Sequence, residues 1–289
     1  MRIDLTVFSV LALTISFGSG GAISAPAGGF QSVSPTPSIV DQPRGSGSPW
    51  LKGGILVAEG CNRRLLLLDR ATKRVVWQAR GLRGAFCIEI LPTGELVVGE
   101  GKSVAVIDSD GNVASRLPAS FQITTDVKAL EGRRLLVSDG AGGTVTEFDW
   151  NGNILWQITG LHWPSEAVRL ENGNTLVADG TRRLKEFDSR GELVGSTQLK
   201  RWAAAVHRLS NGSTLVGEAG AVELLDDTGE PIWLRAGFSR ATSARALSDG
   251  EILVCDPDGG RIVILDAKGH ITWERTGLVR PWHAISLGE

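Results

Sequence analysis

The sequence predicts an all-β fold, a six-bladed β-propeller, and three observations carry this prediction. First, a short apolar phrase that ends in an acidic residue occurs six times, for example at 175–180 and at 55–60. Second, the acidic residues that end the copies are spaced 38 to 41 residues apart. Third, Asn-Gly and Asp-Gly pairs, which favour tight hairpin turns, separate the apolar stretches. A period of this size, built from short strands, is typical of a propeller with one blade per repeat.

Each repeat is expected to form four strands, and the fourth repeat illustrates the pattern. We expect an inner strand at 165–170, a second strand at 175–178, a third at 183–187 and an outer strand at 192–196. Most strands are apolar on both sides, which fits blades that pack face to face.

The two ends of the repeat region predict how the ring closes. The first repeat begins at Gly54 with a second strand and has no inner strand before it. The last segment, 281–287, reads as an inner strand with nothing after it. We therefore expect this segment to complete blade 1 and to remove two exposed sheet edges.

The segments before the repeats have a different character. Residues 1–25 combine an apolar stretch with small residues, which predicts a cleaved signal peptide. Residues 26–52 are rich in Pro, Gly and Ser and read as a linker, so the propeller is expected over 53–289. The chain is therefore expected to be exported to the periplasm or the extracellular space, with no transmembrane span after cleavage.

Bulk composition excludes some classes of function. The 289 residues carry 30 basic and 32 acidic side chains without a long run of either sign, which argues against nucleic-acid binding. We expect a monomer. Of the three cysteines, Cys61 and Cys87 are expected on the same face, so either a disulfide between them or three free thiols is open, Cys255 being the third.

Tryptophan recurs at one position of the outer strand. Four repeats carry it, whereas the second repeat has Ser115 and the fourth has Gly195 at that position; the tryptophans are Trp77, Trp156, Trp233 and Trp273. A recurrent aromatic residue of this kind most simply packs one blade against the next.

The segments 65–77 and 148–156 read as a strand, an Asp, a turn and a strand that ends in Trp. They resemble the repeat of PQQ-like propellers, and the resemblance covers nearly all of 54–287. It implies an architecture that serves many unrelated functions. The ligands of the quinone enzymes have no counterpart here that we can place, so PQQ binding is not predicted.

The acidic residues that end the six copies are expected to lie near one face: Glu59, Glu100, Asp139, Asp179, Glu218 and Asp256. Such a ring could bind calcium. We prefer a structural role, because a carboxylate at a strand end can accept hydrogen bonds from the backbone N–H groups of a neighbouring loop. No cofactor is predicted, with calcium left open.

Positions at which the repeats differ are better candidates for function. The starts of the inner strands should line a central channel, where His283 with Asp126 or Glu166 could perform acid–base chemistry. A ligand site at the channel mouth would further use these residues: Trp163, Trp202, His207, Arg240, Arg245, Arg280 and Trp282. Apolar walls with a few polar groups are the usual composition of a small-molecule pocket.

Enzyme classes built on six blades can be compared with the sequence. A sialidase-like reading fails because the chain has no Tyr nucleophile. An arylsulfotransferase-like strand start is similar around His283, but the other repeats lack the histidine. A lactonase-like metal site lacks an inner-strand Asn, and a lyase-like pair of His283 and Glu166 would have to act from opposite blades.

We therefore predict an exported, non-catalytic propeller that binds or scaffolds a protein, peptide or glycan. The alternative is a hydrolase, lyase or sulfotransferase that uses a channel histidine with carboxylates, with or without a metal ion.

Overall fold

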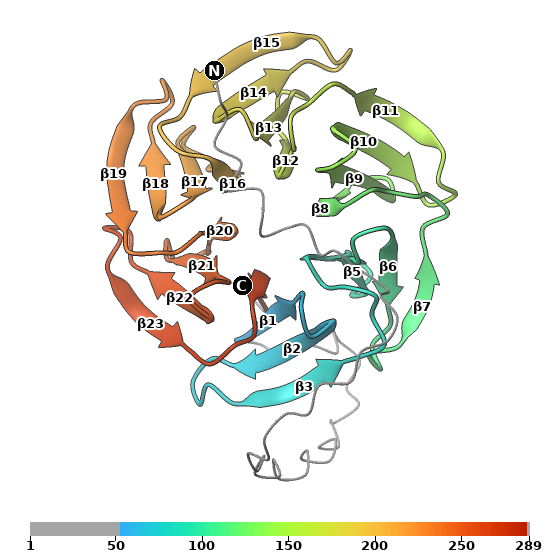
Figure 1. Cartoon of the computed structure of the whole chain (residues 1–289), viewed down its shortest axis with the longest axis vertical. Helices are drawn as coiled ribbons and strands as arrows, with labels where there is room; N and C mark the ends of the chain where they lie inside the picture. Colours follow the sequence, from blue (N-terminus) through green and yellow to red (C-terminus); the bar gives the residue numbers. More distant parts are fainter. Residues whose placement is uncertain (1–52, 288–289) are drawn as a thin grey trace, which may run out of the picture. The chain divides into compact units, whose positions relative to one another are not determined.

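The computed structural model describes residues 53–287, which form six four-stranded antiparallel sheets arranged as blades around a common axis (Figure 1). This confirms the predicted six-bladed propeller. Blade 1 has the strand order β24-β1-β2-β3, and blades 2 to 6 each use four consecutive strands, beginning with β4–β7. The described residues contain no helix that could cross a membrane.

The strands have equivalent places in the six blades. The inner strands, which contact one another around the axis, are β24 (Pro281–Ser286), β4 (Cys87–Ile90), β8 (Thr124–Leu130), β12 (Glu166–Arg169), β16 (Ala203–Arg208) and β20 (Ser243–Ala246). The second strands are β1 (Gly54–Glu59), β5 (Leu96–Gly99), β9 (Arg134–Asp139), β13 (Thr175–Asp179), β17 (Thr214–Glu218) and β21 (Ile252–Asp256).

The remaining strands lie farther from the axis. The third strands are β2 (Arg64–Asp69), β6 (Val104–Ile107), β10 (Thr144–Asp149), β14 (Arg183–Phe187), β18 (Ala221–Leu225) and β22 (Arg261–Leu265). The outer strands are β3 (Val75–Ala79), β7 (Val113–Arg116), β11 (Ile154–Ile158), β15 (Leu193–Gln198), β19 (Pro231–Ala236) and β23 (Ile271–Arg275). In the fourth blade these bounds agree with the sequence-based ones to within one or two residues.

The last strand closes the ring as the sequence predicts. In β24, Ile285 pairs with Leu56 of β1. Two backbone hydrogen bonds extend the pairing at one end, from Gly53 N–H to the Leu287 carbonyl at 2.7 Å and from Leu287 N–H to the Gly54 carbonyl at 2.9 Å. Blade 1 therefore joins the first and last described strands, and no blade lacks its inner strand.

Apolar side chains from neighbouring blades form the core. One cluster contains Leu56 and Leu67 of blade 1 with Ile88 and Leu96 of blade 2. This explains why the second and third strands are buried on both sides, whereas strands of a sheet with one solvent-exposed face are buried on one side only. The free energy of burial is thus gained mainly between blades.

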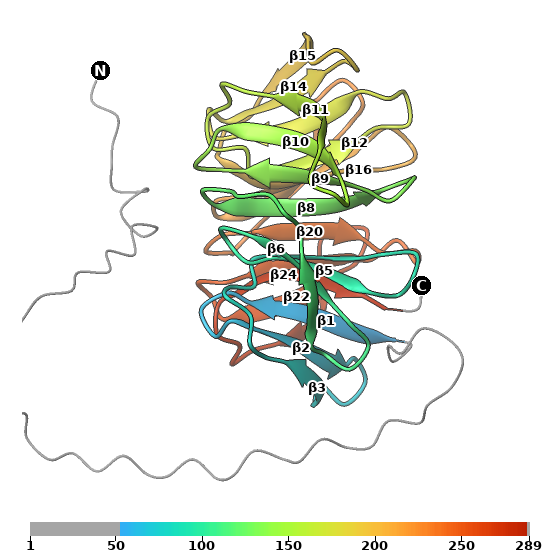
Figure 2. The same ribbon diagram turned by 90° about the vertical axis from the view of Figure 1, so that its right-hand side faces the viewer.

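The loops divide between two faces, which Figure 2 shows from the side. We call one the front face: it carries the loops that lead into the inner strands and those that join second to third strands. The other, the hairpin face, carries the turns that join inner to second and third to outer strands. The inner strands begin at the front face.

Some sequence predictions concern residues outside 53–287. The signal peptide at 1–25, the linker at 26–52 and the last two residues of the propeller range lie outside the described residues. The three cysteines are free thiols, with Cys61 exposed and both Cys87 and Cys255 buried, so the alternative of a Cys61–Cys87 disulfide is not realised.

Candidate functional site

Three side chains meet on the axis of the ring, near the front face. Asp126 of β8, Glu166 of β12 and His283 of β24 occupy equivalent positions at the start of their strands. Their potential metal-ligating atoms all lie within 4.8 Å of one another, and the residues are only 2%, 6% and 4% exposed. The structure thus brings together the three residues proposed for acid–base chemistry. His283 and Glu166 do lie on opposite blades, but both side chains reach the axis, so the opposite placement does not keep them apart.

Lysine 128 neutralises much of the negative charge of this group. It lies two residues after Asp126, on the same side of β8, and its ammonium is 3.1 Å from Asp126 Oδ1 and also bonded to Glu166 Oε1. Arg245 and Glu89 form a further ion pair at 3.5 Å. We call these residues, together with His207 and His283, the axial cluster.

Two members of the axial cluster also bind the backbone of the next blade. Glu166 Oε2 accepts the Val206 N–H of blade 5 at 2.9 Å, and His283 Nδ1 accepts the Ile88 N–H of blade 2 at 3.4 Å. Because Nδ1 faces a donor, a neutral His283 carries its proton on Nε2. These side chains therefore fasten neighbouring blades at the axis.

Burial and neighbouring charges separate the pKa values of the two carboxyl groups. Burial raises the pKa of Asp126 to about 6, against the opposing charge of Lys128. Burial acts in the same direction on Glu166, but the charges of Lys128 and Arg245 outweigh it and lower the pKa of that carboxyl. Glu166 is therefore the permanent anion of the pair, and Asp126 is the group that changes its protonation state.

Both axial histidines are held neutral. Burial, followed by the charges of Arg245 and Lys128, holds the pKa of His283 well below its usual value. Burial also lowers the pKa of His207, although the nearby Glu166 opposes the shift. The cluster thus has nearly balanced charges, with two cations facing Asp126, Glu166 and Glu89.

The chemistry that this arrangement permits is limited. Two carboxylates and a histidine form a donor set that divalent metal ions use. Here, however, the Lys128 ammonium already occupies the cationic place between the carboxylates, and Nε2 of His283 carries a proton. Within residues 53–287, Asp126 Oδ2 and His283 Nε2 have no partner. The cluster therefore presents one acceptor and one donor to a small polar molecule or a water.

The six acidic residues at the ends of the second strands are engaged in hydrogen bonds. Five accept backbone N–H groups from the loop that leads into an inner strand of the same blade; examples are Glu59 with Val279 N–H at 2.7 Å and Asp139 with Ile123 N–H at 2.8 Å. Glu218 instead binds the Arg201 guanidinium at 3.2 Å. These bonds hold the front-face loops, and calcium binding by the ring stays an untested alternative.

An arginine–tryptophan group lies on the front face beside blades 6 and 1. Both Arg240 and Arg280 bind the carboxylate of Asp258, at 2.9 Å and 2.8 Å. The Arg240 guanidinium lies 4.9 Å from the centre of the Trp282 ring, which packs edge-on against Phe86 at 5.9 Å. Three of the predicted ligand-binding residues are therefore neighbours.

The other predicted ligand-binding residues lie elsewhere. Trp163 and Trp202 precede the inner strands of blades 4 and 5. Arg245 and His207 belong to the axial cluster, two positions farther along their strands than the residues that meet at the strand starts. Trp163 and Arg280 share a left-handed backbone, each with φ of 48° and each before a proline. Such strain persists only where surrounding structure holds it, and it often marks functional sites.

The loops on the two faces carry opposite net charge, apart from the five buried carboxylates that end second strands at the front face. The front-face loops between described strands hold nine Lys or Arg residues but two carboxylates, Glu100 and Asp258, of which Glu100 is buried. The hairpin-face loops hold six Lys or Arg residues and 13 Asp or Glu residues. Because consecutive strands run in opposite directions, alternate loops lie on opposite faces. Charges that are scattered along the sequence are thereby sorted into mainly basic loops on one face and mainly acidic loops on the other.

Sequence reasoning missed several of these features. Lys128 and Glu89 received no role from the sequence, although each lies two residues beyond a strand-start position that lines the channel. The ion pairs of Asp258 with Arg240 and Arg280 join loops that are about 20 residues apart in the sequence, so no local pattern indicated them. The charged faces could have been found by assigning each loop to a face.

The fold and the repeat define a six-bladed propeller of the PQQ-like class. The profile of the family described as outer membrane protein assembly factor BamB matches residues 21–183 and, in a second overlapping match, 100–286. Together these matches span most of the chain, so the chain belongs to this family. It matches none of the curated proteins.

Solved structures confirm the fold alone. A protein of unknown function from Bacteroides caccae is 19% identical, with a TM-score of 0.69, over 82% of this chain and 99% of that one. Virginiamycin B lyase from Staphylococcus aureus is 15% identical, with a TM-score of 0.54, over 70% and 73% of the two chains. The WD40 propeller domain of Doa1 is 13% identical, with a TM-score of 0.61, over 80% and 82%.

Proposed function

We propose that this chain is an exported, non-catalytic propeller that binds an acidic segment of a partner polypeptide on its front face. The separation of charge between the two faces carries the proposal. Family membership supports it, because the family is described by an assembly factor, a protein that acts on other proteins. Export follows from the apolar N-terminal stretch and is part of the same proposal.

The exposure of the charged residues favours an anionic partner. Six of the nine front-face cations are exposed, namely Arg63, Arg80, Arg83, Lys102, Arg182 and Lys200. The exposed carboxylate of these loops, Asp258, is already bound to two arginines. Complementary charge steers a partner to such a face and suppresses binding to the other one.

The arginine–tryptophan group would supply the anchoring contacts. Trp282 is partly buried between Phe86 and Arg240 at this face. Tryptophan and arginine are the residues most often responsible for binding energy at protein interfaces. The partner is therefore expected to combine carboxylates with at least one apolar side chain.

The axial cluster fits this proposal as a structural element. Its cations and carboxylates bind one another, and Glu166 also joins blade 4 to blade 5. Groups that are committed to such bonds are poor candidates for moving protons to and from a substrate. We assign the cluster to closing the centre of the ring.

The second candidate is a hydrolase, lyase or sulfotransferase centred on His283, and the convergence of Asp126, Glu166 and His283 favours it. A metal-dependent form of this reading requires a divalent ion to bind beside the Lys128 ammonium, which repels it. Metal titration therefore tests the metal-dependent form of this candidate.

The experiment that tests the first candidate compares charge reversal on the two faces. The probe is a fluorescent synthetic peptide rich in Asp and Glu with one Phe, and its binding is followed by anisotropy. The variant Lys102→Glu/Lys200→Glu changes two exposed lysines of the front face, and Lys73→Glu/Lys268→Glu makes the same change in charge on the hairpin face.

We expect the front-face variant to lose about tenfold in affinity at low salt and the control to lose almost none. Added salt should weaken binding to the unchanged protein. Equal losses in both variants, or no binding of the peptide to the unchanged protein, would overturn the proposal.

A further inference from the structure

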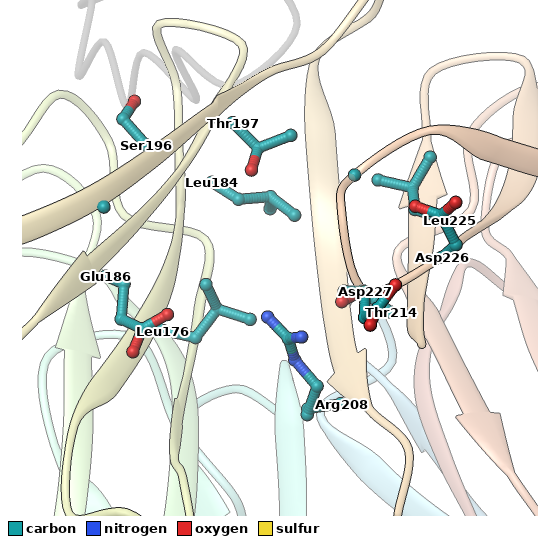
Figure 3. Close-up of a pocket in the computed structure, with 12 residues that line it drawn as sticks. Leu176, Leu184, Glu186, Ser196, Thr197, Arg208, Thr214, Leu225, Asp226 and Asp227 are labelled. Atoms are coloured by element: carbon teal, nitrogen blue, oxygen red, sulfur yellow. The ribbon is translucent and has the colours of Figure 1, made fainter. Parts of the chain in front are cut away.

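A pocket of about 170 Å³ lies between blades 4 and 5, toward the hairpin face and away from the front face (Figure 3). Its apolar wall consists of Leu176 and Leu184 from blade 4 and Leu225 from blade 5. Polar side chains, including Glu186 and Arg208, complete the lining. Figure 3 shows Arg208 reaching toward Leu176.

The repeat itself explains why a pocket exists at this place. Gly195 pairs with Glu186 in blade 4, and the residues at the same register in four other blades are tryptophans: Trp77, Trp156, Trp233 and Trp273. These indoles pack over the turn of the following blade; Trp77 lies against Gly111. Blade 4 has only a hydrogen atom where they have an indole.

Blade 2 also lacks the tryptophan, but another side chain packs against the turn of the following blade. It has Ser115 at the register position, and Pro118 lies against Gly152 of the following blade, 3.0 Å from where a Cβ of that glycine would be. Between blades 4 and 5, the side chain of Thr197 contacts Gly229 of the turn but does not fill the space beside Gly195. The pocket lies in that space. Blade 4 thus has neither the indole nor a substitute for it beside this pocket.

Arg208 is positioned to stack on an indole that residues 53–287 do not supply. Its counterpart one blade earlier, Arg169, binds the Gly173 carbonyl at 3.2 Å and lies 4.6 Å from the centre of the Trp156 ring. Arg208 binds the Gly212 carbonyl at 2.7 Å in the same manner, yet its Nε has no partner within residues 53–287. The cationic half of a cation–π pair is therefore in place.

We propose that this pocket binds a tryptophan side chain of a partner polypeptide. The indole takes the place that the missing tryptophan would occupy and stacks on Arg208. In blade 6, Trp273 Nε1 donates to the carbonyl of Arg70, in the turn of the following blade, at 2.9 Å. Asp227 has the same place in the turn that follows blade 4, so its carbonyl is the equivalent acceptor for the bound indole. Blade 6 thus provides the template for the indole N–H bond, and Trp156 with Arg169 provides the template for the stacking.

The surroundings of the pocket indicate which residues should stand next to that tryptophan in the partner's sequence. Glu186, Asp226 and Asp227 line the pocket, on the face whose loops are acidic. Beside Gly195, the outer strand exposes Leu193 and Val194, which are 55% and 56% accessible. A tryptophan flanked by lysine or arginine fits these charges, and the site is independent of the front-face proposal.

The test uses the peptide acetyl-Lys-Trp-Lys-amide and the propeller, with binding measured by calorimetry. The blocking variant is Gly195→Trp, in which a new Cβ would meet only Glu186 Cβ at an ordinary 3.5 Å. The matched control is Val194→Trp, which adds the same side chain at the neighbouring exposed position. We expect a Kd of roughly 0.1 to 1 mM for the unchanged protein and the control, and no binding to Gly195→Trp.

Further variants and peptides keep the proposal falsifiable if Gly195→Trp fails to fold. Arg208→Ala should weaken binding about tenfold and Arg208→Lys less, and acetyl-Glu-Trp-Glu-amide should bind several-fold more weakly than the lysine peptide. Replacing the peptide's Trp by Ala should abolish binding. Equal affinity of the blocked and unblocked variants, an unchanged affinity of Arg208→Ala, or no binding to the unchanged protein at 10 mM peptide, about ten times the highest expected Kd, would each overturn the proposal.

Discussion

Glu166 of blade 4 accepts the backbone N–H of Val206 in blade 5 at 2.9 Å, and its second oxygen binds Lys128 of blade 3. One buried carboxylate thereby joins three consecutive blades at the axis. His283 makes the corresponding link from blade 1 to blade 2 through the Ile88 N–H. The axial cluster thus acts on the ring as a set of ties between blades, in addition to the apolar contacts that fill the interfaces.

Removing the Glu166 carboxylate should therefore destabilise the whole ring. Glu166→Ala leaves the buried Val206 N–H without an acceptor and removes one of the two carboxylates that bind Lys128. We expect a loss of about 3 kcal/mol in the free energy of unfolding. Glu166→Gln retains an acceptor for Val206 and should lose less. Denaturant unfolding of both variants measures the difference, and equal stability of Glu166→Ala and the unchanged protein would contradict the assignment.

The stability of the ring should depend on pH through Asp126. Its pKa is raised to about 6 in the folded chain, above the value of about 3.9 of an unfolded chain. Between these values the folded state binds the extra proton, so the contribution of Asp126 to stability falls as the pH rises from about 4 to about 6. Asp126→Asn removes this term and should gain up to about 3 kcal/mol relative to the unchanged protein over that range.

The comparison of the two proteins isolates this effect from the histidines. His207 and His283 have lowered pKa values, so the unfolded chain takes up their protons first and stability falls as the pH drops below about 6.5. That trend is common to both proteins and cancels in their difference. Denaturant unfolding at pH 4, 5, 6 and 7 provides the data, and a difference that stays constant with pH would refute the role of Asp126.

The sequence predicted the fold well because the repeat reports the same local physics six times. Alternation of apolar strands with Asn-Gly and Asp-Gly turns is local, and the missing inner strand before Gly54 indicated the closure by 281–287. The site was less predictable, since the meeting of His283 with Glu166 depends on how far side chains reach across the axis. The Gly195 vacancy was visible in the sequence, but its consequence required the neighbouring Arg208 in space.

Deletion of the closing strand tests the architecture most directly. β24 pairs along β1, and its His283 reaches both the axial cluster and blade 2. A chain that ends at Val279 or Arg280 would expose the edge of β1 and the apolar clusters on both sides of blade 1, so unfolding should lose its single cooperative transition. Calorimetry of the truncated and full chains provides the test, and an unchanged melting transition would contradict closure by this strand.

Metal titration decides between the binding and the metal-dependent readings. Because the Lys128 ammonium is bonded to both Asp126 and Glu166, and His283 Nε2 carries a proton, we expect the protein to melt within about 1 °C of the same temperature with excess calcium, zinc or EDTA. The variant Lys128→Met removes the competing cation and should create a measurable shift with a divalent ion, which shows that the assay detects binding at this place. If the unchanged protein instead holds a stoichiometric metal whose removal lowers the melting temperature by several degrees, and Glu166→Gln abolishes that effect, the axial cluster is a metal site and the non-catalytic proposal loses its main structural support.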